Sequence, residues 1–465
     1  MLSKEENEQL TRVGPGTLMG DLLRQYWQPF FLSRHLPESD CPPARVRLLG
    51  EDLIIFRDSS GRVGLVRSNC PHRGASLFFG RNEENGLRCV YHGWKFDVTG
   101  ACVDMPNEPP ESNFKHKIRH TAYPCRERNG IVWAYMGPRA EPPELPELEW
   151  NMVPEDQVYH SLRVAENNFM QPIEGEYDTT HIGFLHQRAT KPYIAPGTPD
   201  EQNWGFIARK YKWARFEVAD TEYGVLIGTR RDLVEEGKLS YWRVYPFLMP
   251  FHTLIPGGGD DPNFSGHAWV PMDDEHTLCL CWDYNAVRPL NETELNRLKH
   301  GSDGLEGLHP TVNIFQPSTG NRPYARYWPR LDYDHDFGFD YEAQKTSRFS
   351  GLPGTWPQDS GMQQSMGRIV DRTIEHLGTA DTGQIAIRRR MLRAARALRE
   401  HATPPPGALN PEVFWLRPVS KLLPADTVSW VDAIKEQMGA GGPIKGSRVP
   451  NGTLLGTVIG ARQGA

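Results

Sequence analysis

The amino-acid sequence predicts an α+β protein with a small all-β domain and a larger domain that combines an antiparallel sheet with long helices. Short strand-like runs separated by Gly, Pro and Asn fill residues 45–135, before the proline-rich segment 137–150. Further strand patterns fill residues 205–285, and helical periodicity dominates residues 359–401. A chain of 465 residues is long enough to form two cores.

The patterns divide the chain into four parts. These are an N-terminal helical segment at 1–40, the all-β domain at 41–145, the larger domain at 146–402 and a C-terminal tail at 403–465. In the larger domain, residues 168–186 have helical periodicity, and the irregular, aromatic segment 300–357 is expected to cover a pocket. The tail is rich in Pro and Gly and is expected to pack on a neighbour or to lack fixed structure.

Charge and composition argue against several classes of protein. The formal net charge is −6 and no basic stripe is present, so nucleic acid is not an expected partner. We expect no secretory signal and no membrane span, because no apolar run approaches ~18 residues. The seven cysteines suggest no disulfide framework and favour a reducing, cytoplasmic location. Cys279 and Cys281 are expected to be two thiols on one face of a sheet.

The sequence contains two short pairs of potential metal ligands. Cys70 and His72 form the first pair, and Cys89 and His92 form the second, with sixteen residues between the pairs. Zinc sites of this composition usually group the cysteines first and the histidines later, whereas here each loop supplies one of each. This arrangement favours a [2Fe–2S] cluster with thiolates on one iron and imidazoles on the other.

A second group of potential ligands lies in the segment ENNFMQPIEGEYDTTHIGFLH, residues 166–186. Helical spacing would place Asp178 one turn before His181 and on the same face, with His186 further along. Iron(II) oxygenases commonly hold their metal with two histidines and one carboxylate. Spacing alone does not choose the carboxylate among three later candidates: Asp359, Asp371 and Glu375.

Together these motifs resemble the oxygenase (alpha) subunits of the Rieske non-haem iron ring-hydroxylating oxygenases. C-x-H, sixteen residues and C-x-x-H followed by Gly-Trp is similar to their cluster motif, and D-x-x-H-x4-H is similar to their iron motif. The segment MQPIEGEYDTTHIGFLH resembles the branch that contains phthalate and phenoxybenzoate dioxygenases and aryl O-demethylases. The resemblance spans residues 10–378 and implies a catalytic domain of the helix-grip type, in which an antiparallel sheet is packed with long helices.

The resemblance implies roles for particular residues. Cys70, His72, Cys89 and His92 would hold the Rieske cluster, and His181, His186 and Asp359 would hold mononuclear Fe(II). Asp178 would be catalytic, linking His92 of one subunit to His181 of its neighbour in a homotrimer or a dimer of trimers. Electrons would come from NAD(P)H through a separate flavin/iron–sulfur reductase, because this chain has no G-x-G-x-x-G fingerprint.

The implied reaction is O2-dependent hydroxylation of an aromatic substrate, giving either a cis-diol or, from a methoxyarene, an O-demethylated phenol. Arg243 in YWRVYPFLMPF could bind a carboxylate, which favours an aromatic carboxylate, although a structurally paired arginine fits the same pattern. Weaker candidates, expected mostly to face solvent, are Arg209, Arg215, Arg230 and Arg231. Two alternatives remain at this point: a Rieske electron-transfer protein without oxygenase activity, and a zinc-stapled binding protein.

Overall fold

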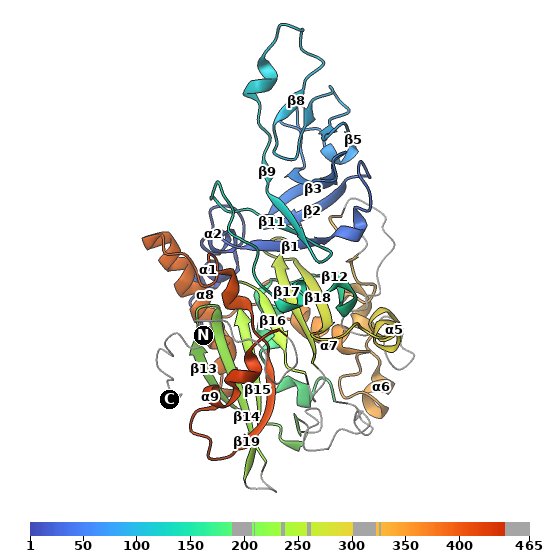
Figure 1. The fold of residues 1–465 in the computed structure, drawn as a ribbon. Helices are drawn as coiled ribbons and strands as arrows, with labels where there is room; N and C mark the ends of the chain where they lie inside the picture. The colour runs from blue at the N-terminus through green and yellow to red at the C-terminus, as the bar shows by residue number, and fades with distance from the viewer. Residues whose placement is uncertain are drawn as a thin grey trace.

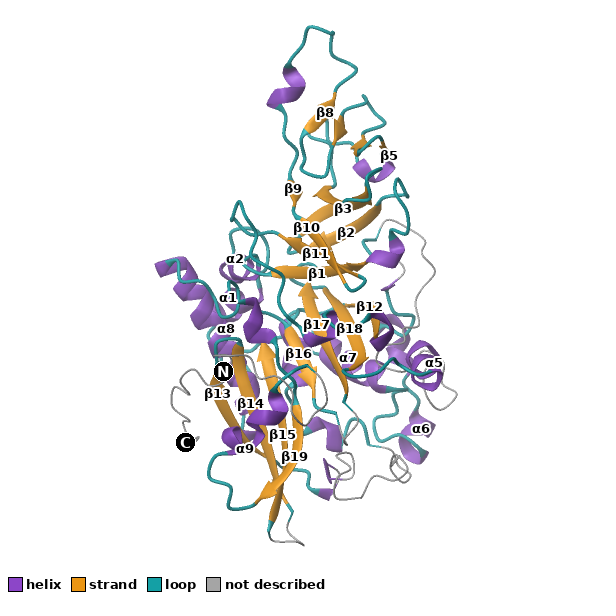
Figure 2. Ribbon diagram, viewed as in Figure 1, coloured by secondary structure: helices purple, strands orange, loops and turns teal. Residues whose placement is uncertain are grey.

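The computed structural model describes residues 1–187, 207–208, 210–233, 238–257, 262–300, 322–324 and 327–441. The molecule is elongated, with small sheets at one end and a large sheet flanked by helices at the other (Figure 1). Strands from the N-terminal third and from the middle of the chain form separate sheets (Figure 2). This architecture confirms the predicted α+β class.

Two four-stranded antiparallel sheets form the small end of the molecule. The first contains β2 (Ala44–Leu48), β3 (Glu51–Arg57), β4 (Val63–Arg67) and β9 (Ala122–Tyr123). The second contains β5 (Arg81–Glu83), β6 (Gly86–Arg88), β7 (Lys95–Phe96) and β8 (Cys102–Asp104). A third sheet joins this end to the rest of the molecule and contains β1 (Trp27–Leu32), β11 (Ile131–Tyr135) and β10 (Cys125–Arg128).

The apolar run in β3 serves two cores. Because side chains alternate along a strand, Ile54 and Phe56 pack into a small core that also contains Cys70 and Cys89. Leu53 and Ile55 face the opposite way, into the main hydrophobic core. The two cysteines are therefore positioned by the packing of the small sheets.

The large sheet is antiparallel, in the order β12-β18-β17-β16-β15-β14-β13. Its strands are β12 (Val158–Ala165), β13 (Arg215–Asp220), β14 (Gly224–Asp232), β15 (Leu239–Leu248), β16 (His252–Ile255), β17 (Asn263–Pro271) and β18 (Thr277–Asn285). Strand β16 pairs with only the last residues of the long β15. The remaining edge of β15 pairs instead with β19 (Val419–Pro424).

The helices of the described part of the chain pack around this sheet (Figure 1). They are α1 (Lys4–Thr11), α2 (Leu18–Leu23), α3 (Met170–Glu176), α5 (Glu292–His300), α6 (Tyr341–Thr346), α7 (Thr355–Ser365), α8 (Thr382–His401) and α9 (Trp430–Met438). Helices α1 and α2 pack on α8, so the N-terminal segment contacts the last long helix of the larger domain. Helix α7 packs on α3, which brings the two halves of the second metal motif together.

The expectation of a tail from residue 403 is wrong for residues 403–441. Strand β19 completes the sheet edge, and α9 packs on β19. Arg417 is fully buried and pairs with Glu149, with Nη2 to Oε1 at 2.5 Å. Residues 442–465 lie outside the described part of the chain.

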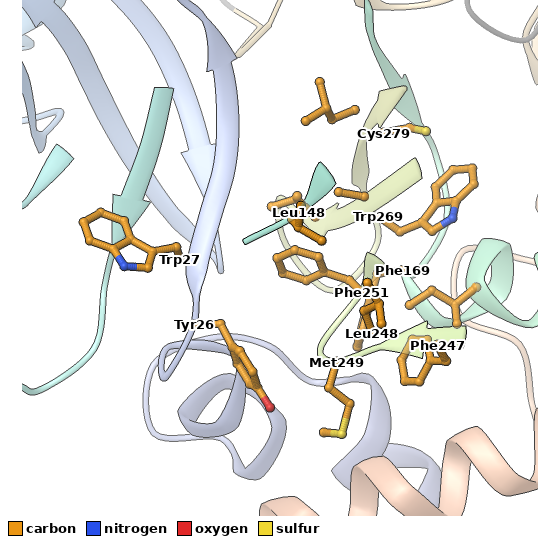
Figure 3. Close-up of a cluster of buried hydrophobic side chains, with 14 of the residues drawn as sticks. Tyr26, Trp27, Leu148, Phe169, Phe247, Leu248, Met249, Phe251, Trp269 and Cys279 are labelled. Carbon is orange, nitrogen blue, oxygen red and sulfur yellow. The ribbon is translucent and has the colours of Figure 1, made fainter. Parts of the chain in front are cut away.

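One continuous hydrophobic core joins the small end, the N-terminal helices and the large sheet. Figure 3 shows part of it, where Phe169, Leu248 and Phe251 lie close together. Trp269 and Cys279 extend the same core along β17 and β18. Among the described residues, no helix is both long and apolar enough to cross a membrane.

Candidate functional site

The first candidate site lies on two loops that share one backbone geometry. In each loop the glycine N–H donates to the cysteine carbonyl at 2.9 Å, and the cysteine N–H donates at 2.8 Å to the carbonyl of the residue after the glycine. The loops are closed by Gly74 (φ +77°) and Gly93 (φ +81°), a backbone region that favours glycine. Each tight turn presents its cysteine, Cys70 or Cys89, from the small core.

The loops bring two buried thiols and two half-buried imidazoles together. The ring centroids of His72 and His92 are 4.5 Å apart, and His72 also stacks on Trp94 at 4.5 Å. Burial raises the pKa of Cys70 to about 11, so a thiolate there needs a cation close by. The mixed set of donors from two loops fits a [2Fe–2S] cluster.

The spread of the same four ligands argues against a single zinc ion. Among the described residues, two groups of three potential ligands have their atoms within 4.8 Å of one another, and neither group contains a residue of these loops. Four ligands of one zinc ion converge on one point, whereas a two-iron cluster is held from two sides.

The second motif differs locally from its prediction. Helix α3 ends at Glu176 and a short 3₁₀ helix begins at His181, so residues 168–186 do not form one helix. Between them, Asp178 Oδ1 accepts hydrogen bonds from the backbone N–H of Thr180 at 2.8 Å and of His181 at 3.3 Å. Such a turn competes with helical hydrogen bonding. Asp178 is therefore held near His181 by this turn, not by helical spacing.

Three ligand atoms meet beside this turn. Nε2 of His181 is 3.1 Å from Nε2 of His186, and Oδ1 of Asp359 on α7 lies 3.2 Å from the latter and 3.7 Å from the former. Ligands about 2.1 Å from one ion and at right angles lie about 3 Å apart, so these atoms could bind one metal. Burial opposes ionisation of Asp359, but the charge and hydrogen bond of His186 outweigh it and lower the pKa of the carboxyl.

In both histidines the second ring nitrogen, Nδ1, lies near a polar side chain. His186 Nδ1 donates to Gln358 Oε1 at 2.7 Å, and Gln358 Nε2 donates to the Leu352 carbonyl at 3.1 Å. His181 Nδ1 lies 3.7 Å from Asp178 Oδ2. Burial raises the pKa of Asp178, but hydrogen bonds and charge from His181 and Thr180 lower it to about 2. Partners of this kind fix the orientation of metal-binding imidazoles.

The structure separates Asp359 from the two other carboxylates considered. Asp371 is exposed and its Oδ1 accepts from the N–H and hydroxyl of Thr373. Glu375 accepts from Arg388 at 2.6 and 2.9 Å. Helix α7 ends at Ser365 and α8 begins at Thr382, so the helix predicted over 359–401 is interrupted.

A cavity of about 280 Å³ adjoins the three ligand atoms. Its lining includes both arginine and aromatic side chains: Arg163, Arg243, Tyr245, Trp269 and Trp356. Arg243 is buried, as expected for a pocket residue, and its Nε donates to the Tyr245 hydroxyl at 2.6 Å. A second, larger cavity of about 880 Å³ has Asp178 and His181 in its wall.

The weaker arginine candidates have different surroundings. Arg231 is buried, against expectation, and donates to the Thr179 carbonyl at 2.8 Å. Arg230 is half-buried and pairs with Asp232, while Arg215 is exposed. Arg209 lies outside the described residues.

Sequence reasoning gave no role to Gln358, Arg163 or Trp356. Gln358 could have been found from its place directly before the proposed carboxylate ligand. Arg163 and Trp356 carried no comparable signal, because their proximity depends on the packing of β12 against α7.

Comparison with known protein families identifies both domains of the chain. The family model for the Rieske [2Fe-2S] domain matches residues 26–122. The model for the LigXa C-terminal domain-like family matches residues 134–303 and 314–418. Together these matches cover most of the chain.

Individual relatives give the same result. The oxygenase subunit of 3-chlorobenzoate-3,4-dioxygenase from Comamonas testosteroni is 39% identical over 94% of this chain and 99% of its own length. That of phthalate 4,5-dioxygenase from Pseudomonas putida is 38% identical, over 85% of this chain and 87% of its own length. That of 5,5'-dehydrodivanillate O-demethylase from Sphingobium sp. is 29% identical, over 95% and 90%.

Solved structures share the fold. Pseudomonas putida CBB5 NdmB has a TM-score of 0.55 at 18% identity, over 87% of this chain and 99% of its own. The terminal oxygenase of carbazole 1,9a-dioxygenase from Novosphingobium sp. KA1 has a TM-score of 0.51 at 19% identity, over 84% and 95%. The chain belongs to the Rieske non-haem iron oxygenases, as an oxygenase subunit. This assignment confirms the oxygenase interpretation over a pure electron-transfer protein.

Proposed function

We propose that this chain oxidises an aromatic carboxylate, and that the reaction is cis-dihydroxylation. The observation that carries the proposal is a cavity lined by buried Arg243 and aromatic side chains beside the three ligand atoms. Two relatives at 38–39% identity are named as dioxygenases of 3-chlorobenzoate and phthalate, which are both aromatic carboxylates. Electrons would come from NAD(P)H through a separate flavin/iron–sulfur reductase. The seven cysteines are free thiols, which suits a reducing, cytoplasmic location.

We assign the cofactor ligands as follows. The Rieske cluster is held by Cys70, His72, Cys89 and His92, and the mononuclear Fe(II) by His181, His186 and Asp359. When bound, the cluster supplies single electrons and the iron activates O2. Gln358 holds the proton on Nδ1 of His186, which leaves Nε2 free to bind the metal.

We further propose that Asp178 joins the two sites across a subunit boundary. Within one chain, the cluster loops belong to the small sheets at one end of the molecule, whereas α7, which carries Asp359, lies apart from them beside the large sheet (Figure 1). Asp178 is half-buried and lies in the wall of the larger cavity. A neighbouring subunit seated there would bring its His92 to this carboxylate, which makes a homotrimer or a dimer of trimers the working unit.

The substrate proposal is tested by turnover with reductase on a panel of benzoates, phthalates, methoxybenzoates and their neutral amides. With ¹⁸O2, cis-dihydroxylation places both labelled atoms in one product. O-demethylation instead releases formaldehyde and an unlabelled phenol. Oxidation of the neutral arenes with no turnover of any carboxylate would overturn the proposal.

The ligand assignment is tested by iron analysis. His186→Ala should remove about one iron per chain, as expected when a ligand of the facial triad is lost, and should leave the visible spectrum of the cluster intact. His401→Ala, at the exposed end of α8, serves as the control and should keep full iron content. Full iron content in His186→Ala would rule out this ligand.

A further inference from the structure

A second group of potential metal ligands lies on the large sheet. Cys279 and Cys281 are two residues apart on β18, so their thiols point to the same face. His267 of β17 lies directly opposite Cys281. One ligand atom from each of these three residues lies within 4.8 Å of the other two, and all three side chains are buried. The pairing of two strands thus brings two thiols and an imidazole together.

The separation of the two sulfurs suits one tetrahedral ion. Sγ of Cys279 lies 3.5 Å from Sγ of Cys281, and both are free thiols. Two zinc–sulfur bonds of about 2.3 Å at a tetrahedral angle place the sulfurs about 3.8 Å apart. Thiolate ligands favour zinc over hard ions such as Mg²⁺ and Mn²⁺. Two thiolates and one imidazole are a three-ligand zinc set that leaves one position for a small ligand.

Glu176 lies beside the imidazole of this group. Oε1 of Glu176, the last residue of α3, is 2.7 Å from Nδ1 of His267. The contact is not aligned as a hydrogen bond, so it acts mainly through charge. Zinc-binding histidines commonly have a carboxylate at their second nitrogen, which orients the ring and makes it a better ligand. Nε2 of His267 is then the nitrogen left to bind a metal.

The charges around the three residues suit a divalent ion. Arg163 is fully buried, and its Nη2 donates to Sγ of Cys281 at 2.6 Å. The positive charge of Arg163 and the negative charge of Glu176 offset each other. Two thiolates then balance the two charges of Zn²⁺, so the filled site would be neutral. Neutrality matters here because a net charge in a buried site is costly.

The same face of the sheet offers a route to the site. His267 and Glu176 line the cavity of about 280 Å³ that adjoins the proposed iron ligands. An ion that enters this cavity meets two sets of donors. The iron set contains two imidazoles and a carboxylate, whereas the group on the sheet contains two thiols. A thiophilic ion would favour the second set.

We propose that His267, Cys279 and Cys281 form a zinc site in the sheet wall of this cavity, separate from the iron position. Glu176 positions His267, and Arg163 donates to the thiolate of Cys281. Zinc binding displaces the protons held by the thiols and the imidazole. This inference goes beyond the proposed function and does not depend on the identity of the substrate.

The competing explanation is a buried hydrogen-bonded network without a metal. Burial disfavours a thiolate at Cys281, but the hydrogen bond from Cys279 and the charges of Arg163 and His267 hold the pKa of this thiol below its usual range. Burial raises the pKa of the Cys279 thiol well above its usual range. A network of this kind needs no ion, and it predicts no zinc uptake that depends on Cys279.

The test is uptake of Zn²⁺ by the anaerobic holoenzyme, with Cd²⁺ as a spectroscopic probe. Thiolate-bound Cd²⁺ absorbs in the ultraviolet, and the proposed iron ligands contain no sulfur that could give this band. We expect about one Zn²⁺ per chain beyond the iron. Equilibrium dialysis with metal analysis measures its affinity, and ultraviolet difference spectra of the Cd²⁺-treated protein show whether thiolates bind the ion.

Four variants locate the ion. Cys279→Ser and Cys281→Ser should each weaken Zn²⁺ binding by more than about 100-fold and remove the Cd²⁺ band, because each removes a ligand. Glu176→Gln should weaken binding by about 10- to 100-fold, the usual effect of losing an outer partner of a ligand. Cys41→Ser, at another buried free cysteine, should bind Zn²⁺ as the parent protein does. Cluster absorbance, iron content and the thermal unfolding midpoint confirm that each variant is intact.

Two kinds of result would overturn the site. The first is no Zn²⁺ uptake, or uptake that neither Cys279→Ser nor Cys281→Ser weakens. The second is loss of one iron for each Zn²⁺ bound without a Cd²⁺ band, which would place the ion at the iron position. If Cys281→Ser does not fold, Cys279→Ser alone decides, because it leaves the hydrogen bond from Arg163 to Cys281 in place.

Discussion

At the scale of single residues, the two histidines proposed as iron ligands are each approached by a side chain that is not itself a proposed ligand. Gln358 and Asp178 approach the outer nitrogens of the two imidazoles from different elements, α7 and the turn after α3. The amide oxygen of Gln358 accepts a hydrogen bond and carries no charge, whereas a carboxylate increases the basicity of the imidazole beside it. The two histidines are therefore held by different means.

We expect Gln358→Ala to weaken iron binding about 10- to 100-fold, because His186 loses the acceptor that fixes its ring. Gln358→Glu keeps an acceptor and should retain the metal. Gln364→Ala, a buried glutamine on the same helix, is the matched control. Iron titration followed by ultrafiltration measures the affinity, and unchanged affinity in Gln358→Ala would show that the hydrogen bond is dispensable.

At the scale of elements, the sequence predicted which segments carry the ligands better than how those segments fold. The strands of the small domain and of the large sheet were predictable because their apolar residues alternate or run together. The predicted helix at 168–186 was wrong because the side chain of Asp178 accepts hydrogen bonds from the backbone N–H groups of Thr180 and His181, which hydrophobic periodicity does not reveal. The segment after residue 403 was also misjudged, because β19 depends on a distant edge of β15.

The corrected C-terminal segment gives a stability prediction. Arg417→Met should destabilise the fold by about 3–5 kcal/mol, because it leaves Glu149 buried without its cation. Adding Glu149→Gln should recover part of this loss. Arg399→Met, which breaks an exposed pair with Asp21, should cost about 1 kcal/mol or less. Equal thermal unfolding midpoints for Arg417→Met and Arg399→Met would show that the buried pair does not stabilise the fold, as expected if this segment were only a tail.

Strand β12 gives a prediction about acid stability. Burial among aromatic side chains lowers the pKa of His160 to about 3. The unfolded chain binds a proton at this position below about pH 6.5, while the folded protein does not until about pH 3. The contribution of neutral His160 to the free energy of unfolding is therefore complete above about pH 6.5. Between about pH 6.5 and pH 3 this free energy falls by about 1.4 kcal/mol per pH unit.

The variant His160→Phe keeps a ring in place and removes the titration. The unfolding midpoint of the parent protein should fall more steeply between pH 7 and pH 5 than that of the variant. His401→Gln, at the exposed end of α8, should follow the parent protein. Parallel pH curves for His160→Phe and the parent protein would show that this histidine does not titrate on unfolding.

At the scale of the whole molecule, we propose that electron transfer takes place between subunits of an assembly. Asp178→Asn keeps the shape of the turn but removes the charge that faces His181. Both metal sites should fill, yet reoxidation of the reduced cluster with substrate and O2 should slow by about 10- to 100-fold. Stopped-flow absorbance measures this step, with Asp371→Asn as an exposed control. Loss of iron in Asp178→Asn would instead make it a support of the iron site.

The sequence could not define this assembly, because neither motif shows which subunit its partner comes from. Resemblance to the family suggested the crossing, and the separation of the small sheets from α7 within one chain agrees with it (Figure 1). The contact between Arg163 of β12 and Trp356 of α7 was also beyond sequence analysis. Both features arise from contacts between distant elements.

The most direct test of the electron path combines two inactive chains. His72→Ala chains should lack the cluster and His186→Ala chains should lack the mononuclear iron, so each homogeneous assembly should be inactive. Co-expression with different affinity tags and purification through both tags isolates mixed assemblies. We predict that these mixed assemblies regain turnover, because a cluster in one subunit can serve the iron of its neighbour. Mixed assemblies that contain both cofactors but remain inactive would contradict electron transfer across the subunit boundary.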